Sequence, residues 1–241
     1  MALLAIDVGN SRLKWGVHDG STWIATAAAD HAESASLADI WAQLPAVTRA
    51  IGSNVAGHAV RVSVDATLAK LGLAARWIES QSAQCGVRNL YRDPSQLGSD
   101  RWAALIAARS LCPEACLVVN AGTAVTIDAL SAQGEFLGGL IVPGLDLMRE
   151  ALARDTSQLG RERGSYATFP RNTADAIASG AIQSVAGAVE RMRAQLRSRS
   201  DDVVAVIASG GAIGTLRSHL LPDTAVVDNL VLHGLLAISR A

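Results

Sequence analysis

Residues 3–17, LLAIDVGNSRLKWGV, begin with an apolar run that ends at Asp7. A turn containing Gly9 and Asn10 follows, and a second run then alternates apolar and polar residues. A strand, a tight turn with glycine and a polar residue, and a returning strand are typical of a β-hairpin. The sequence therefore predicts a hairpin at the start of the chain.

The same plan occurs a second time in residues 117–130, LVVNAGTAVTIDAL. When the two stretches are aligned, Asp7-Val8-Gly9 falls on Asn120-Ala121-Gly122. Glycine hairpins are common, so two unrelated hairpins are the alternative explanation. A repeated hairpin predicts two similar lobes, over 1–115 and 116–241.

Strands and helices alternate along the rest of the chain. Apolar runs predict strands over 50–54, 75–79 and 203–208, and longer amphipathic stretches predict helices over 64–71, 100–111 and 173–197. The segment 143–153 is a further element, and two short helical stretches follow residue 211. This alternation predicts the α/β fold class.

The composition excludes several classes of protein. The chain has 241 residues, of which 50% are apolar and 18% charged, so it holds ample material for a core and is not disordered. A net charge of -1 argues against binding to nucleic acid or to an anionic membrane. The apolar runs are too short to span a bilayer, and Asp7 interrupts the first of them, which argues against a signal peptide.

Three cysteines bear on the compartment. Cys85, Cys112 and Cys116 are odd in number, and no histidine stands near the last two to complete a zinc site. We expect reduced cysteines and a cytoplasmic location.

The first turn has the residues of a phosphate-binding loop. Successive N–H groups of a glycine turn can point at a phosphate, and Asn10 and Ser11 add neutral donors. Asp7 could hold a phosphate-bound Mg²⁺, and Lys14, one of only two lysines, could contact phosphate oxygens. The structural alternative is an ordinary hairpin turn, because such turns favour Gly-Asn.

Two further glycine elements could contact a nucleotide. The second hairpin offers Gly122 with the hydroxyls of Thr123 and Thr126. Ser209-Gly210-Gly211 follows a predicted strand, where an adenosine group could lie against bare backbone. Three such elements in this order favour a nucleotide site more strongly than any one of them.

The stretch Gly98-Ser99-Asp100-Arg101 opens a predicted helix. Asp100 could act as a general base, and the Arg101 guanidinium could bind a substrate carboxylate, with Tyr91 nearby in the same site. The structural alternative makes Ser99 or Asp100 the N-cap of the helix and leaves Arg101 solvated.

Taken together, these motifs resemble the type III pantothenate kinases over nearly the whole chain. The motifs that carry the resemblance are Asp7 to Ser11 with Lys14, Tyr91 with Pro94, Gly98 to Arg101, Ala121 to Ala124, Gly138 to Gly144, Asn172-Thr173, and Ser209 to Gly211. The resemblance implies the duplicated ribonuclease H-like fold of the acetate/sugar kinase–Hsp70–actin superfamily, with ATP held between two lobes. It also implies ATP-dependent phosphorylation of pantothenate to 4′-phosphopantothenate, the first step of coenzyme A synthesis, with Mg²⁺.

The family's functional residues map onto this chain by position. The first ATP phosphate loop corresponds to Asp7, Val8, Gly9, Asn10, Ser11, Arg12, Leu13 and Lys14, and Thr123 corresponds to an ATP contact of the second loop. Asp100 corresponds to the proton acceptor. The pantothenate contacts correspond to Tyr91, Gly98, Ser99, Asp100, Arg101 and Thr173.

The chain departs from the family pattern in two places. Many members have an aspartate that ligates K⁺ or NH₄⁺ where this chain has Asn120, which keeps a carbonyl oxygen but loses the charge. The monovalent cation is therefore in question here. Ser11 stands where threonine is more usual, and the hydroxyl is retained.

Two other functions fit the same motifs. One is a kinase for another small carboxylate or sugar. The other is a non-catalytic regulator, since members of this family have been described as transcriptional accessory factors. A regulator would tolerate the loss of Asp100, whereas a kinase would not.

The long helix after Thr173 carries a continuous apolar seam, which consists of Ala178, Ile182, Val185, Val189, Met192 and Leu196. Spacings of three and four residues are typical of a coiled-coil interface, and they also fit a helix that faces its own core. The resemblance implies a homodimer whose interface lies beside the substrate site. We therefore expect this helix to mediate dimerisation.

Overall fold

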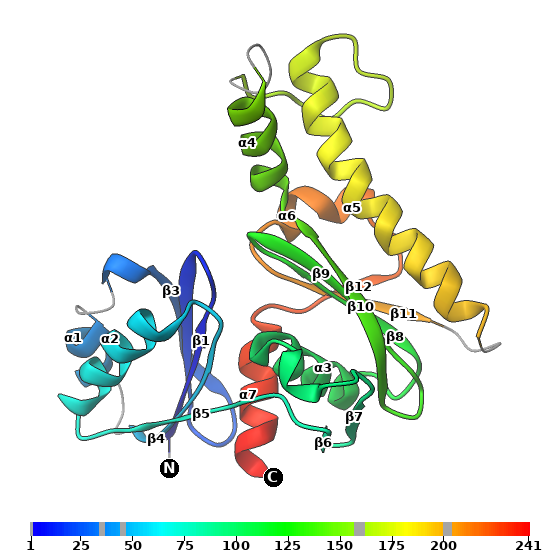
Figure 1. The fold of residues 1–241 in the computed structure, drawn as a ribbon. Helices are drawn as coiled ribbons and strands as arrows, with labels where there is room; N and C mark the ends of the chain where they lie inside the picture. The colour runs from blue at the N-terminus through cyan, green and yellow to red at the C-terminus, as the bar shows by residue number, and fades with distance from the viewer. Residues whose placement is uncertain (1, 34–36, 44–46, 157–161, 200–203) are drawn as a thin grey trace. The chain divides into compact units, whose positions relative to one another are not determined.

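A computed structural model describes residues 2–33, 37–43, 47–156, 162–199 and 204–241. The chain divides into two compact units (Figure 1). Unit 1 comprises Met1–Leu111 together with Asn229–Ala241, and unit 2 comprises Cys112–Asp228. The final helix thus belongs to unit 1, although the sequence division at residue 115 would assign it to the second lobe.

Unit 1 is built on a five-stranded sheet with the order β3-β2-β1-β4-β5. The first three strands are antiparallel neighbours, and β4 and β5 add to β1 in parallel. The predicted hairpin is confirmed as β1 and β2, which a turn at Gly9 joins. The strands are β1 Ala2–Val8, β2 Arg12–His18, β3 Trp23–Asp30, β4 Val47–Asn54 and β5 Ala75–Trp77.

Unit 2 repeats this plan in its own sheet. The order β10-β9-β8-β11-β12 has the same sequence of antiparallel and parallel neighbours. Val55 N–H donates to the Val8 carbonyl in unit 1, and Ala212 N–H donates to the Ala121 carbonyl in unit 2, both over 3.0 Å. The strands are β8 Cys116–Ala121, β9 Ala124–Leu130, β10 Glu135–Pro143, β11 Ala205–Ser209 and β12 Thr224–Val226. The repeated hairpin therefore reflects a duplicated ribonuclease H-like fold.

Helices cover both faces of the unit 1 sheet (Figure 1). Helices α1 (Leu37–Ala42) and α2 (His58–Ala69) bury apolar side chains in one core with alternate residues of β1. Helices α3 (Ser99–Leu111) and α7 (Leu230–Arg240) pack on the sheet through β4 and β1. Because side chains alternate along a strand, Asp7 shares its face of β1 with Leu3 and Ala5, opposite the α1 and α2 core. A small hairpin, β6 (Ala83–Gln84) and β7 (Val87–Asn89), precedes α3.

Helices α3 and α7 approach each other at backbone distance. A Cβ atom at Gly234 of α7 would overlap the Ala103 backbone of α3, so this crossing requires glycine. Seven consecutive residues of α3, Trp102 to Ala108, are buried. Helix α3 is therefore held firmly along most of its length, behind the first turn that carries Asp100.

In unit 2 the predicted long helix is confirmed as α5, Thr173–Arg197. Four residues of its apolar seam, Ile182, Val185, Val189 and Leu196, are buried in the core of unit 2, and Met192 packs against the same core. The expectation that this seam forms a dimer interface is therefore wrong. The spacing of the apolar residues fits both a coiled-coil interface and a helix that faces its own core. In the structure the apolar face packs on the sheet of the same unit.

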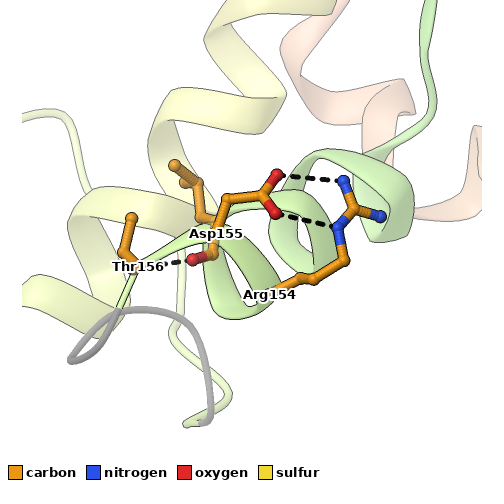
Figure 2. A network of polar contacts seen from close by, with 4 residues as sticks. Arg154, Asp155 and Thr156 are labelled. Carbon is orange, nitrogen blue, oxygen red and sulfur yellow. Dashed lines mark hydrogen bonds and ion pairs between the residues drawn. The ribbon is translucent and has the colours of Figure 1, made fainter.

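Helix α4 (Leu145–Asp155) ends in a local polar network (Figure 2). The Arg154 guanidinium donates two hydrogen bonds to the Asp155 carboxylate, over 2.9 and 3.0 Å, and the Thr156 hydroxyl donates to the Leu152 carbonyl over 2.7 Å. The Thr156 N–H group donates to the same carbonyl over 3.1 Å, so the hydroxyl adds a second hydrogen bond at the end of the helix. The ion pair is exposed and contributes little to stability.

The remaining helical piece of unit 2 is α6, Ile213–Leu216. The predicted strand over 203–208 begins at Ala205, and Val203 lies outside the described residues. Across the described ranges, none of the helices is long and apolar enough to cross a membrane.

Candidate active site

Two acidic residues of the predicted site lie in unit 1, on elements that face each other. Asp7 is the penultimate residue of β1, on the sheet face opposite the α1 and α2 core, and it is only 9% exposed. Asp100 lies in the first turn of α3 and is partly buried. Among the described residues, the Asp7 Oδ1 atom has no hydrogen-bond partner. A buried carboxylate oxygen without a donor is costly, so this atom suits a proton or a cation.

The environment shifts the titration of both carboxyl groups. Burial raises the pKa of Asp7 to about 7, with a further increase from the charge of Asp100 and an opposing effect of Lys14. Burial also raises the pKa of Asp100, against the Arg101 N–H bond and the Arg101 charge. The site therefore holds two carboxyl groups that resist being ionised together.

The turn after Asp7 presents backbone and small polar groups to solvent. The side chains of Asn10 and Ser11 are exposed, whereas those of Val8 and Leu13 are fully buried in the core. Val8 and Leu13 can therefore contact a nucleotide only through their main chain. Arg12 is exposed, and its Nε atom lies 3.4 Å from the Oδ1 atom of Asp30. Lys14 is the register partner of Asp7 in the hairpin.

His31 supports this turn, although the sequence gives no sign of it. Its Nε2 atom lies 2.8 Å from the Gly9 carbonyl oxygen. The Gly9 N–H group donates to the Arg12 carbonyl over 3.1 Å, which closes the turn. His31 stands 22 residues from Gly9 in the chain, so only the fold brings the two together.

The start of α3 explains the glycine before Asp100. A Cβ atom at Gly98 would lie 2.6 Å from the Asp100 Oδ1 atom, so glycine leaves room for the carboxylate. The Gly98 carbonyl accepts the Trp102 N–H bond over 2.9 Å, which makes Gly98 the N-cap in place of Ser99 or Asp100. Asp100 Oδ1 accepts the Arg101 N–H bond over 2.8 Å.

Arg101 is buried, so the solvated alternative is wrong. The residue is 5% exposed, and its guanidinium donates to the Tyr91 hydroxyl over 3.3 Å and lies 5.8 Å from the centre of the Tyr91 ring. Asn89, which the sequence analysis did not select, accepts the Tyr91 N–H bond over 3.0 Å. The structure thus brings Tyr91, Asp100 and Arg101 together, and a buried guanidinium suits an anionic ligand.

The other predicted contacts belong to unit 2. Asn120 ends β8 next to the turn, and Gly122 and Thr123 are exposed in the turn itself. The Gly144 N–H group donates to the Thr123 carbonyl over 2.8 Å, so the end of β10 supports this turn. Gly210 follows β11 with a φ of 112°, where its bare backbone lies against Ala121. Thr173 is the exposed first residue of α5, after the N-cap Asn172.

The residues of unit 1 fit a divalent cation only in part. The unpartnered Asp7 oxygen is the donor type that Mg²⁺ prefers. Over the described ranges, no group of three or more His, Cys, Asp or Glu side chains is placed to hold a metal ion. A Mg²⁺ ion at Asp7 would therefore take most of its ligands from phosphate and water.

The raised pKa of Asp7 predicts how stability depends on pH. The folded state binds this proton more tightly than the unfolded state, whose carboxyl has a pKa of 3.8. The stabilisation is complete below pH 3.8 and is lost as the pH rises to about 7. Above pH 7 the Asp7→Asn variant should be more stable than the native chain by about 1–4 kcal/mol.

Urea unfolding of the nucleotide-free protein between about pH 5 and 8 measures this effect. The native chain should lose stability relative to Asp7→Asn across that range. Asp39→Asn, an exposed carboxylate of α1, is the matched control and should follow the native chain. Equal pH slopes for the native chain and Asp7→Asn would contradict the burial argument.

Comparison with known proteins agrees with this arrangement. A family model described as type III pantothenate kinase matches residues 3–195. A type III pantothenate kinase from Aromatoleum aromaticum is 50% identical over 238 residues, which cover 99% of this chain and 98% of that protein.

Solved structures share the fold at low sequence identity. A protein from Sinorhizobium meliloti described as a 2-dehydro-3-deoxygalactonokinase has a TM-score of 0.65, is 17% identical, and is matched over 99% of this chain and 98% of its own. A Campylobacter jejuni protein described as a Baf-family transcriptional activator has a TM-score of 0.61, is 20% identical, and is matched over 98% of this chain and 97% of its own. These likenesses show the actin-like fold and carry no statement about activity. The family match and the relative at 50% identity establish that the chain belongs to the type III pantothenate kinase family.

Proposed function

We propose that this protein transfers the γ-phosphoryl group of ATP to the 4′-hydroxyl of pantothenate, which yields ADP and 4′-phosphopantothenate. Family membership supports the reaction. The observation that carries it in this chain is the burial of Asp100 and Arg101 side by side, on the helix that faces the Asp7 turn. A base and a carboxylate-binding group on consecutive residues suit a substrate with a hydroxyl and a carboxylate.

Asp100 takes the proton of the substrate hydroxyl in this mechanism. The oxygen attacks the γ-phosphorus, the bond to the β-phosphate oxygen breaks, and the proton moves to the Asp100 carboxylate. Because burial raises the pKa of Asp100, the group is a stronger base than an exposed aspartate. Phosphoryl transfer depends mainly on positioning and electrostatics, so a carboxylate fixed beside the reacting oxygen suffices.

The Asp7 turn and the second hairpin receive the nucleotide. The exposed residues of the turn, Asn10 and Ser11, and the Lys14 ammonium contact phosphate oxygens, and Thr123 of unit 2 is a further ATP contact. Asp7 would hold a Mg²⁺ ion, which would neutralise charge on the transferred group. Ser99, Gly98 and Tyr91 line the pantothenate site with Arg101, and Thr173 is a further contact.

Asp100→Asn tests the proposal most simply. The substitution keeps the shape of the side chain but removes the base, so kcat should fall about 10²–10⁴-fold without loss of stability, because the amide avoids the burial of a charge. Direct detection of 4′-phosphopantothenate, with other small carboxylates and sugars offered in parallel, identifies the substrate. Asp39→Asn is the control for folding and purity. Near-native turnover of Asp100→Asn would remove Asp100 from the chemistry.

Arg101→Ala tests the contact with the carboxylate. The variant should weaken pantothenate binding at least about tenfold while ATP binding changes little, because the guanidinium contacts Tyr91, which belongs to the proposed pantothenate site. Arg101→Lys should recover little, since an ammonium cannot reproduce the two-pronged contact. Arg109→Ala, at the far end of α3, is the control. Equal losses for both substrates, measured by calorimetry, would contradict the assignment.

Asn120 bears on the monovalent cation. Because it lacks the charge of an aspartate, we propose that activity depends weakly, or not at all, on K⁺. Titration with KCl against tetramethylammonium chloride measures this dependence. Asn120→Asp should create or sharpen activation by K⁺, and strong saturable activation of the native chain would contradict the proposal.

We further propose that the protein is a cytoplasmic homodimer. The buried seam of α5 does not support the dimer, but another part of unit 2 does. Among the described residues of unit 2, the large exposed apolar side chains fall within residues 140–169, and they are Leu140, Ile141, Leu147, Leu152 and Phe169. Phe169 is 86% exposed and stands four residues before Thr173, which the family places beside the substrate.

A further inference from the structure

Ser53 lies beside Asp7 in the unit 1 sheet. Strands β1 and β4 are parallel, and Ser53 is the register partner of Asp7. Register partners on neighbouring strands direct their side chains to the same face, so Ser53 faces α3 together with Asp7. Its residue has no exposed surface. None of the predicted nucleotide or substrate contacts includes this serine.

The Ser53 hydroxyl reaches the helix that carries the proposed base. Its Oγ atom lies 2.9 Å from the Ser99 Oγ atom, within hydrogen-bond distance. Ser99 is the first residue of α3 and directly precedes Asp100. One partly buried hydrogen bond thus joins the neighbour of Asp7 on the sheet to the neighbour of Asp100 on the helix.

The first turn of α3 is held by this bond together with Arg101, on the other side of Asp100 in the chain, whose buried guanidinium contacts Tyr91. From Trp102 onward the helix is fixed by buried side chains and by the close crossing with Gly234. Gly98, which precedes the turn, has no side chain to anchor it. Loss of the Ser53 hydroxyl would also leave the partly buried Ser99 hydroxyl without this partner, which favours movement of the turn.

We propose that Ser53 is a positioning residue, which acts through Ser99 to hold the Asp100 carboxylate at its place opposite Asp7. The inference rests on the proposed role of Asp100 as proton acceptor. The rate of phosphoryl transfer depends strongly on the position of the reacting groups. A displacement of about 1 Å can lower the rate about 100-fold. Ser53→Ala should therefore lower kcat at least about tenfold.

The Ser53→Ala substitution should change the binding of the nucleotide very little. The Asp7 turn is closed by its own bonds between Gly9 and Arg12, on strands that Ser53→Ala leaves paired. The affinity for Mg-ATP, measured by calorimetry, should stay within about twofold of the native value. A general loss of structure would weaken both substrates, so the split between kcat and ATP affinity separates positioning from folding.

A double-mutant cycle tests whether Ser53 acts through Ser99. The variants are Ser53→Ala, Ser99→Ala and the two combined, with kcat measured by release of 4′-phosphopantothenate. Once Ser99→Ala has removed the partner, Ser53→Ala should cause no further loss. Losses that multiply in the double variant would overturn the inference.

Two controls keep the test sharp. Ser110→Ala removes a hydroxyl that donates to the Ile106 carbonyl at the far end of α3, and it should leave kcat unchanged. If Ser53→Ala fails to fold, Ser53→Cys keeps the volume with a weaker hydrogen bond and should show a smaller loss of kcat.

Asp100→Asn, measured alongside, distinguishes the inference from the proposed function. If Asp100→Asn is inactive and Ser53→Ala retains kcat within about twofold, the inference fails and the proposed function stands. If Asp100→Asn retains turnover, the proposed function fails, and the inference about Ser53 fails with it because it rests on the role of Asp100.

Discussion

The burial of two carboxyl groups, Asp7 and Asp100, in one apolar unit is the constraint on which the rest of the site depends. Burial raises the pKa of both groups, and the charge of Asp100 raises the pKa of Asp7 further. Such an arrangement costs stability in the empty protein. Binding of a cation or a proton lowers this cost. A site of this kind suits phosphoryl transfer, because the nucleotide brings a metal ion with it.

Two glycines and two arginines place the helices around these carboxyl groups. Gly98 leaves room for the Asp100 carboxylate, and Gly234 allows α7 to lie against α3 behind it. Arg49 of β4 donates to the Ser239 carbonyl over 2.9 Å, and Arg240 donates to the Gly20 carbonyl over 2.9 Å. The last helix of the chain is thus fastened to the sheet that carries Asp7, while its middle sets the position of the helix that carries Asp100.

The two repeats of the fold differ in the residues at equivalent positions. Each copy of the fold has a hairpin, two parallel strands and a following helix, so α3 and α7 hold the same place in their repeats. Asp7 pairs with Ser53 in unit 1, and Asn120 pairs with Ser209 in unit 2. Of these two positions, only the one in unit 1 carries a carboxylate, so the proposed Mg²⁺ contact has no counterpart at Asn120.

Part of this account could be predicted from the sequence. Hairpins with glycine turns, the α/β class and the whole of α5 follow from local patterns, because turn chemistry and apolar periodicity are local. The direction of the α5 seam, the burial of Arg101 and the contacts of His31 and Ser53 depend on what the fold brings against them. Strand β3 was missed because its residues, WIATAAAD, lack the alternation of a half-buried strand.

The most direct test of the central claim is a titration of the two carboxyl groups by ¹³C NMR in the nucleotide-free protein. The account predicts a pKa of about 7 for Asp7, a lower pKa for Asp7 in the Asp100→Asn variant, and loss of the proton from Asp7 when Mg-ATP binds. An Asp7 carboxyl that titrates at its ordinary pKa near 3.8 and ignores the Asp100→Asn substitution would contradict it.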